Sequence, residues 1–520
     1  MDALASQAPT APMIRFIARR LAMAVGILLA LSFMVYGVLT AAMDPMEDLR
    51  LSTAPNKAQL VAARTRLLSL DEPWYVRYWG WLTQFVQGNP GIAWQTKQRV
   101  VDMLPDAVST SVQLVFGATI IATLLGVTIG VVSALRQYTG FDYSITFVSF
   151  VLYSLPIFWV AVLLKEYLAI RLNDFLIEPV ILWPALLAFS LVAALFWVGV
   201  LGGDRRRKLF ILVTSFAVTL GTLYFLLTSQ WIHDPLLGIV GLGVLSLAAA
   251  YVLTMLFAGI KNKRALYSAV TTVGVGLALY YPLLWVFANY EMTNGYLFVL
   301  LLSALAIGGA IGWAFGGPDR MVSVRGAMLV ALVMSVLVYA DQIMRVWESY
   351  SASSAIKNRP IATIGSATPG LNADYWTTYL DKFTHLMLPT IALVLISFAG
   401  YTRYERGATL EVLQQDYIRT ARAKGLPERV VIVRHALRNA LMPLASIIPG
   451  DIVALIGGAV LTETIFGWGG MGHMFVSSLR NSEIDPVMTY VMITGALAMI
   501  ANLIADFLYA ILDPRIRVNA

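Results

Sequence analysis

The chain has 520 residues, of which 58% are hydrophobic and only 13% are charged, and its formal net charge is +7. A soluble domain cannot bury so large a share of apolar surface, and several apolar runs exceed the ~18 residues typical of a membrane-spanning helix. Because the chain has no cysteine, disulfides and thiolate metal sites are excluded. The composition therefore predicts an all-α polytopic membrane protein, in which excess Lys and Arg mark cytoplasmic loops rather than nucleic-acid binding.

The first span is expected at about 21–42, directly after Arg15, Arg19 and Arg20. This apolar run is longer than the ~7–15 residues of a signal peptide, so we interpret it as a retained anchor with a cytoplasmic N-terminus. A stretch rich in Trp and Tyr follows at 44–103. It predicts an extracytoplasmic region whose aromatic residues lie at the membrane interface, form a small packed lid or contact substrate.

Eleven further apolar runs bring the expected total to twelve spans, at about 107–134, 145–170, 181–202, 209–229, 236–259, 266–289, 296–316, 325–342, 385–404, 442–463 and 487–510. Around the middle six, nine Lys and Arg lie in alternate links, at 204–208, 261–264 and 320–325, whereas the other links hold only Arg171. The positive-inside rule places the nine in the cytoplasm. Both ends of the chain are then cytoplasmic.

These features divide the chain into six expected parts. They are an N-terminal tail with the first span (1–42), an extracytoplasmic region (43–104), core helices two and three (105–174), a transmembrane block (175–345), an extracytoplasmic loop (346–383) and the last core helices (384–520).

The most informative segment lies between the last core helices, at 416–443, and is helix-forming and basic. Gly425 is expected to end a first short helix, and Pro427 suits the first turn of a second. In that second helix an apolar stripe is expected, with arginines facing elsewhere: Val430, Val433 and Leu437 against Arg429, Arg434 and Arg438. Charge alone favours an ordinary cytoplasmic loop. The order of small residues, glycine, proline and apolar stripe favours a docking element.

Ionisable residues inside spans are candidates for function. Asp451 follows Pro449 and Gly450 in a late span, where its carboxylate either faces a watery translocation path or accepts a structural hydrogen bond. Glu463 is a second candidate for the path, with a structural role favoured. The four histidines are scattered, so no metal site is expected.

Several motifs occur in a fixed order: MIRFIARRL at 13–21, LSLDEPWYVRYWGWL at 68–82, YIRTARAKGL at 417–426 with RHALRNALMP at 434–443, and GGAVLTETIFGWGGMG at 457–472. Together they resemble the permeases of binding-protein-dependent ABC importers, and more closely the first permease of the dipeptide/oligopeptide (nickel) branch. The resemblance covers about 1–170 and 383–520. The block at 175–345 has no counterpart in the six-helix core of that family.

The resemblance implies a type I importer permease core with about six inserted helices, located in the plasma (cell inner) membrane among its lipids. It implies a second permease subunit, two ATPase subunits that carry ATP and Mg, and an extracytoplasmic solute-binding protein. Peptides are the best-supported cargo, with nickel chelates, haem and oligosaccharides left open. It also implies that a cytoplasmic segment, 408–441, couples to the ATPases through Asp416, Tyr417, Arg419, Thr420, Ala421, Arg422, Ala423, Lys424, Gly425 and Leu426.

One departure from the family pattern is that Arg419, Thr420 and Ala421 stand where the general motif has Glu-Ala-Ala, a variation found in the oligopeptide branch. The chain has no G-x-x-x-x-G-K-[ST] loop, which fits a transport subunit that is not itself an enzyme and binds no cofactor. Two other classes stay open. They are an ion-coupled secondary transporter, which would show inverted repeats, and a membrane-embedded lipid- or glycan-modifying enzyme.

Overall fold

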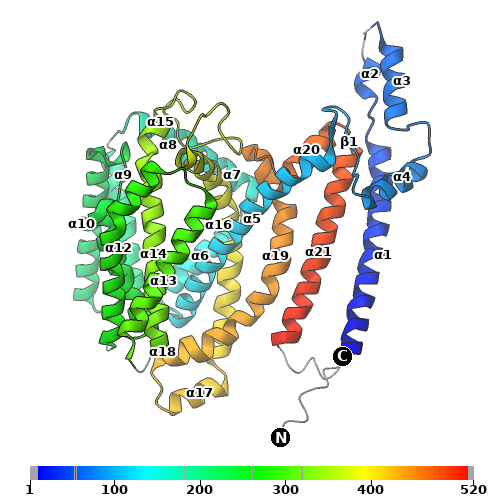
Figure 1. Ribbon diagram of the computed structural model, residues 1–520. Helices are drawn as coiled ribbons and strands as arrows, with labels where there is room; N and C mark the ends of the chain where they lie inside the picture. Colours follow the sequence, from blue (N-terminus) through cyan, green and yellow to red (C-terminus); the bar gives the residue numbers. More distant parts are fainter. Residues whose placement is uncertain are drawn as a thin grey trace. The chain divides into compact units, whose positions relative to one another are not determined.

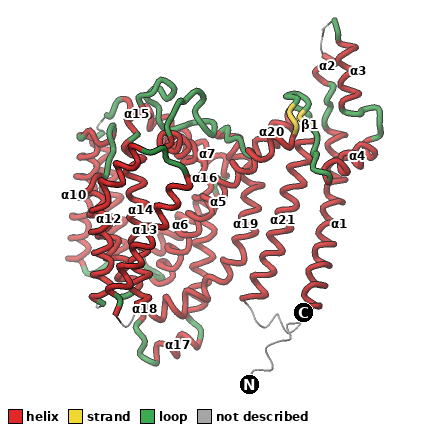
Figure 2. Tube along the Cα trace, in the orientation of Figure 1, coloured by secondary structure: helices red, strands yellow, loops and turns green. Residues whose placement is uncertain are grey.

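The computed structural model describes residues 10–51, 53, 55–180, 182–259, 262–317 and 320–512, and these are almost entirely helical (Figures 1 and 2). Among them, eleven helices are long and apolar enough to cross a membrane, or up to twelve when one bent pair counts as a span. This confirms the predicted all-α polytopic class. Two compact units are present, one of residues 1–168, 363–366 and 386–520 and the other of 169–362 and 367–385.

The first unit holds the N-terminal and C-terminal helices of the chain. Before its first long internal span come α1 (Thr10–Ala42), α2 (Glu47–Leu51), α3 (Lys57–Leu67), α4 (Trp74–Val86) and a hairpin of β1 (Ile92–Ala93) and β2 (Gln98–Arg99). The hairpin is antiparallel and pairs Ile92 with Arg99 and Ala93 with Gln98. The unit continues with α5 (Val100–Leu135), α6 (Gly140–Ser154), α7 (Ile157–Lys165), most of α16 (Tyr375–Leu413), α17 (Asp416–Ala423), α18 (Glu428–Val430), α19 (Leu437–Phe466), α20 (Met471–Arg480) and α21 (Ile484–Leu512).

The core of the first unit forms where α5 crosses α16 and α19. Gly126 and Gly130, spaced as in G-x-x-x-G, lie on the face of α5 toward α16, and a Cβ on Gly126 would come within 2.6 Å of the Tyr401 Cβ. Small residues at this spacing let two helix backbones approach closely. Buried side chains on the three helices, including Leu114, Leu393 and Leu444, fill the space beside this crossing.

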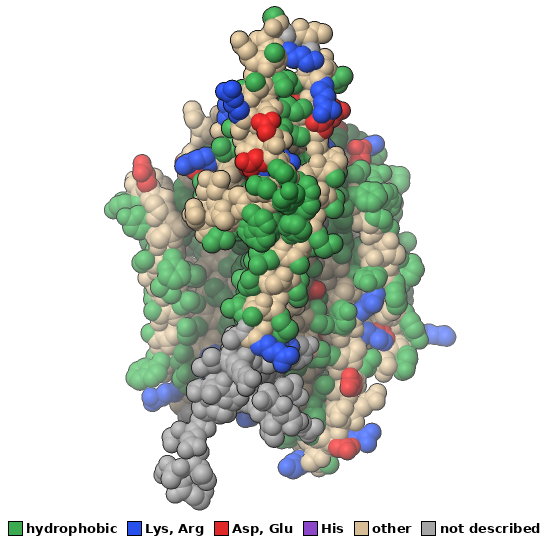
Figure 3. Space-filling model, turned by 90° about the vertical axis from the view of Figure 1, so that its right-hand side faces the viewer, with side chains coloured by type: hydrophobic (Ala, Val, Ile, Leu, Met, Phe, Trp, Pro, Cys, Tyr) green, Lys and Arg blue, Asp and Glu red, His purple; other side chains and the backbone are tan. Residues whose placement is uncertain are grey.

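The aromatic stretch after the first span packs partly onto the membrane helices of the same unit. Tyr78 and Trp81 of α4 are buried against Tyr36 of α1 and Met488 of α21, and the Tyr78 hydroxyl lies 2.8 Å from Ser32 Oγ. Figure 3 shows hydrophobic side chains covering α1, with charged side chains gathered beyond them on α2 and α3. Of the expected alternatives, a small packed structure describes α4 better than aromatic residues that only lie at the membrane interface. A contact of this region with substrate stays a prediction.

The third expected span, at 145–170, is not one continuous helix. Its two halves, Gly140–Ser154 and Ile157–Ile177, meet at an angle of 100°. Leu155 and Pro156 have extended backbones, with ψ of 131° and 135°. Proline disfavours a helical conformation in the residue before it and cannot donate the next helical hydrogen bond, so the region of the expected span is two helices joined at a sharp bend.

The second unit contains the predicted block at 175–345. It holds the end of a π-helical turn (Glu166–Ile170, of which 169 and 170 are in this unit), α8 (Arg171–Ile177), α9 (Trp183–Leu201), α10 (Arg205–Thr228), a 3-10 turn (Gln230–Ile232), α11 (Gly238–Phe257), α12 (Lys263–Asn289), α13 (Asn294–Phe315), α14 (Arg320–Arg345), α15 (Trp347–Ser351) and the start of α16. Six of these, α9 to α14, are candidate spans. That the block is an insertion into a smaller core stays a prediction.

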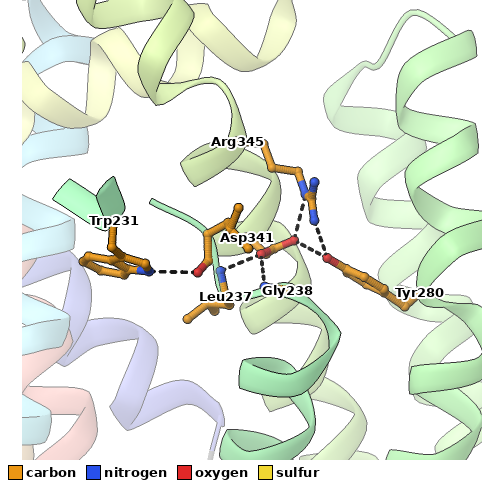
Figure 4. A network of polar contacts seen from close by, with 7 residues as sticks. Trp231, Leu237, Gly238, Tyr280, Asp341 and Arg345 are labelled. Carbon is orange, nitrogen blue, oxygen red and sulfur yellow. Dashed lines mark hydrogen bonds and ion pairs between the residues drawn. The ribbon is translucent and has the colours of Figure 1, made fainter. Parts of the chain in front are cut away.

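One buried carboxylate organises the second unit (Figure 4). Asp341 of α14 is fully buried and accepts hydrogen bonds from the backbone N–H of Leu237 and of Gly238 at 2.8 Å each, where α11 begins. The Tyr280 hydroxyl of α12 donates at 2.7 Å, and Arg345 Nε donates at 3.0 Å. A single side chain thus ties three helices of this unit together.

Candidate functional site

The basic segment connects α16 to α19 at the end of the first unit opposite to α20 and the β hairpin (Figure 1). It begins with α17, turns at Gly425 and becomes helical again at α18. A π-helical turn at Val431–Ala436 then leads directly into α19. The expected second helix is therefore the first part of a membrane helix rather than a separate element.

The turn between the two helices has the conformation that the glycine predicts. Gly425 has a φ of +73°, a region in which other residues are strained. The N–H of Leu426 reaches back to the carbonyl of Ala421 at 3.4 Å, which satisfies a carbonyl at the end of α17. Pro427 lies just before α18, as its N-cap, one position earlier than expected.

The inner face of the segment is small and apolar. Ile418 and Ala421 of α17 are buried together with Val431 and Ala436. The expected stripe of Val430, Val433 and Leu437 is wrong, because Val433 is 50% exposed and Val431 takes the buried position. A π-helical turn contains one residue more than an α-helical turn. The next buried residue after Val431 is therefore Ala436, five positions further on, rather than the residue four positions on.

The outer face of α17 carries most of the residues that the sequence singles out for coupling. Of these, Ala421 is buried and the rest are exposed: Asp416, Tyr417, Arg419, Thr420, Arg422, Ala423, Lys424, Gly425 and Leu426. The structure brings all ten onto one helix and its closing turn. The exposed residues form a surface whose role is not explained by this chain by itself.

Short-range polar contacts hold this outer face in place. Arg422 donates from Nε and Nη2 to the Glu428 carboxylate across the turn, at 2.7 Å for the shorter contact. This hydrogen bond to Glu428 raises the pKa of Arg422 above its usual value. Asn439 of α19 donates to the Tyr417 hydroxyl at 2.7 Å. Arg419 has only a long contact of 3.5 Å to Asp416. The segment is thus a braced helix that offers its cations outward, an arrangement suited to hydrogen bonding with carboxylates of another protein.

The two candidate residues of the translocation path, Asp451 and Glu463, are separated along α19 by twelve residues, or ~18 Å. Asp451 is half-buried and lies near the Tyr401 hydroxyl of α16. Glu463 is fully buried. The structure does not bring the two carboxylates together.

Glu463 has the surroundings of a helix cap. Its Oε2 accepts hydrogen bonds from the backbone N–H of Gly472 at 2.7 Å and of His473 at 3.1 Å, in the first turn of α20. Ser111 of α5 donates to its other oxygen, and Ser111 Oγ also accepts from the N–H of Met471. These contacts favour the structural interpretation of Glu463, because its acceptors face the protein and not a path.

The sequence interpretation missed an ion pair near the coupling segment. Asp142, at the start of α6, is buried and accepts from Arg406 Nε at 2.7 Å and Nη2 at 2.9 Å. Ser133 at the end of α5 and the N–H of Tyr138 also donate to it. The pair joins the α5–α6 turn to the part of α16 that leads into α17. Its only sequence signal was an arginine placed three turns before the segment. Within the described residues, no group of three or more His, Asp or Glu side chains is placed to hold a metal ion.

Two family models match the chain. The model of the binding-protein-dependent transport system inner membrane component matches residues 277–518, and the model of the N-terminal part of such membrane components matches residues 13–114. The first match contains α13 to α21 with the whole coupling segment, so it also covers the last part of the block at 175–345, and the second contains α1 to α4 and the β hairpin. The two matches lie in chain order, as in a single membrane component with its N-terminal part.

Curated relatives match a shorter region. The oligopeptide transport system permease protein OppB of Mycobacterium tuberculosis is 43% identical over 155 residues, which cover 30% of this chain and 48% of the relative. AppB of Bacillus subtilis, also an oligopeptide transport system permease protein, is 47% identical over 146 residues (28% and 46%). The dipeptide transport system permease protein DppB of Escherichia coli K12 is 42% identical over 139 residues (27% and 41%).

The chain thus spans about half the length of the curated relatives it matches. The likeness, the two family models and the helical membrane fold agree. The chain belongs to the family of binding-protein-dependent transport system inner membrane components.

Proposed function

We propose that the chain is one permease subunit of an ATP-driven ABC importer and forms half of a translocation path across the plasma membrane. A second permease subunit completes the path. Two ATPase subunits bind ATP and Mg, and an extracytoplasmic solute-binding protein delivers the cargo. Both ends of this chain lie in the cytoplasm, on the same side as α17; the ends at 1–9 and 513–520 fall outside the described residues.

The observation that carries the proposal is the construction of the segment from α17 to α19. A short helix is braced on its inner side by Ile418 and Val431, and it displays Arg419, Arg422 and Lys424 on its outer side. An ordinary loop needs neither a buried inner face nor a left-handed glycine at its turn. A helix that must transmit force to a partner needs both, because rigid elements position contacts better than loops.

We further propose that the cargo is a peptide. The support is the printed role of the relatives, which are oligopeptide and dipeptide transport permeases. Within the described residues no metal-binding cluster supports a nickel-specific site in this chain, and haem and oligosaccharides have no supporting observation.

The test is cargo-stimulated ATP hydrolysis and dipeptide uptake by the complex reconstituted in vesicles with its binding protein. Arg419→Glu reverses an outward cation whose contact with Asp416 is exposed, so it leaves the fold intact. We expect it to lower stimulated hydrolysis and uptake by about tenfold, the effect of ~1.4 kcal/mol at the contact. If the ATPase subunits no longer co-purified with the Arg419→Glu variant, this result would also place their contact on α17.

The matched control is Arg206→Glu, an exposed arginine in the first turn of α10. Its new carboxylate suits a helix N-terminus, and hydrolysis and uptake are expected to stay at the wild-type level. If Arg419→Glu behaved like this control, the segment would be a cytoplasmic loop, and uptake without ATPase subunits would then mark a secondary transporter. Stimulation by haem or nickel chelates but not by peptides would overturn the cargo alone.

A further inference from the structure

The second unit contains a cavity of about 500 Å³ between α12, α13, α14 and the start of α16. Figure 1 shows these helices side by side. Within the second unit, α14 packs closely against both α12 and α13. The volume lies within the ~300–1,000 Å³ of ligand pockets in proteins. The coupling segment does not account for the cavity, because that segment belongs to the first unit and the cavity to the second.

The cavity has an apolar floor and an apolar mouth. Its floor includes Phe287, Met334 and Val338, which are all buried. Its mouth includes Phe298 and Val336, whose side chains are 60% and 58% exposed. On a helix that crosses the membrane, such exposed apolar side chains face lipid, so the cavity opens toward the hydrocarbon of the bilayer rather than toward water.

Polar groups gather at one end of the cavity. Asn294, the first residue of α13, accepts hydrogen bonds at Oδ1 from the Tyr375 hydroxyl at 2.7 Å and from the Tyr379 hydroxyl. All three residues line the cavity. With Oδ1 occupied by two donors, the amide nitrogen of Asn294 has no hydrogen bond to another described side chain or backbone group, and it is a donor at the rim of a largely apolar space, as is the Tyr339 hydroxyl.

The cavity is elongated along α13. Lining residues on this helix run from Asn294 to Ile307, a separation of thirteen positions that spans ~20 Å at 1.5 Å per residue. One leaflet of the hydrocarbon core is ~15 Å thick, so the cavity is long enough for a whole hydrocarbon tail. A peptide would leave its backbone N–H and C=O groups unpaired against these walls, which is costly in an apolar site.

We propose that this cavity binds one acyl chain of a phospholipid from the surrounding bilayer, with the ester carbonyl of that chain accepting a hydrogen bond from the Asn294 amide. The chain lies between α13 and α14 with its methyl end toward Ile307. The occupant is a lipid and not a partner helix, because about 500 Å³ spread over ~20 Å of length leaves a cross-section of about 25 Å², enough for one extended hydrocarbon chain and too narrow for a helix of ~10–12 Å diameter. The second unit is thereby a lipid-binding element of the membrane subunit.

The probe is a phosphatidylglycerol with a photoreactive diazirine in its second acyl chain, mixed into phosphatidylethanolamine vesicles that hold the intact protein. After illumination, labelled peptides are mapped by mass spectrometry. We expect labels concentrated on the cavity segments of α12, α13 and α14, and displacement of those labels by excess unlabelled phosphatidylglycerol. Labels spread evenly over the exposed apolar faces of α9 and α10 would mean unspecific boundary lipid and would overturn the proposal.

Two variants of neighbouring alanines sharpen the test. Ala304 lines the cavity, whereas Ala306 on the same helix is exposed and does not. Ala304→Phe fills the space and is expected to lower the displaceable labelling by about tenfold, while Ala306→Phe leaves it unchanged. Equal labelling in the two variants would contradict the proposal. If Ala304→Phe fails to elute as a folded protein, the wild-type map and its displacement decide the question, and cross-links to another protein chain instead of lipid would assign the cavity to a partner helix.

Discussion

At the scale of single residues, buried carboxylates in this protein serve as caps and clamps. Glu463 receives two backbone N–H groups from the first turn of α20 and the Ser111 hydroxyl of α5. A carboxylate at a helix N-terminus also suits the positive end of the helix dipole. Buried and fully occupied, this side chain is placed to hold the turn after α19 and not to meet cargo.

Glu463→Ala is therefore expected to destabilise the protein by about 2–3 kcal/mol, since buried donors lose their acceptor. The measurement is thermal unfolding of the purified protein in detergent. Glu411→Ala removes an exposed carboxylate of α16 and is the control, with no change expected. Loss of transport by Glu463→Ala at an unchanged unfolding temperature would return this residue to the translocation path.

Asp341 makes the same kind of clamp in the second unit, with a stronger expected effect. Asp341→Ala leaves two N–H groups at the start of α11 and the Arg345 guanidinium without their acceptor, and removing one partner of a buried ion pair costs about 3–5 kcal/mol. We expect a loss of this size in unfolding experiments and faster amide exchange at the start of α11. Asp234→Ala, in the exposed link before α11, is expected to change neither, and equal effects of the two would remove Asp341 from its organising role.

At the scale of elements, local patterns predicted what local sequence determines. Gly425 ends α17 because its backbone needs a positive φ, and the long apolar runs became helices because their backbone groups must be paired inside a membrane. The bend at Pro156 had a visible cause that the length of the apolar run concealed. The π-helical turn at Val431–Ala436 had none, because it depends on how α19 leaves the membrane.

Contacts between distant residues were beyond the reach of such patterns. Ser111 and Glu463 are 352 residues apart, and nothing near either one indicates the other. Asp341 lies at the end of the span expected at 325–342, a place where the sequence does not distinguish an exposed interfacial carboxylate from a buried one. The candidate coupling residues were found because they are consecutive, whereas Asp142 and Arg406 are joined only by the fold.

The turn after α17 gives a prediction at this scale. A Cβ on Gly425 meets no atom within 4 Å, so Gly425→Ala adds only backbone strain, about 1–2 kcal/mol for a left-handed residue. We expect amide exchange in α17 to quicken by about 5-fold to 30-fold. Gly407 in the helical part of α16 also has open space, and Gly407→Ala is expected to slow exchange there slightly, since alanine favours a helix. Unchanged exchange in Gly425→Ala would mean that the turn does not hold α17.

At the scale of the whole molecule, the number of crossings decides which parts share a side of the membrane. Basic residues open α10, α12 and α14, whereas His233 and Asp234 lie in the link after α10 and Glu291 in the link after α12. The six candidate spans from α9 to α14 are an even number, so they return the chain to the side from which it entered. The bent pair at Leu155 and Pro156 decides this count, since a 100° bend suits either a broken span or a loop that re-enters on one side.

Single cysteines resolve that step, because the natural chain has none and gives no background. From Thr96 to Asp234 the chain makes four crossings if the bent pair spans the membrane and three if it does not. We expect Thr96→Cys and Asp234→Cys both to react with an impermeant maleimide in intact cells. From Asp234 to Lys424 there are five crossings, so Lys424→Cys should react only after the membrane is opened, as should Arg206→Cys. Labelling of Thr96→Cys without Asp234→Cys would make the bent pair re-entrant, and the block would then face the opposite way to its positive charges.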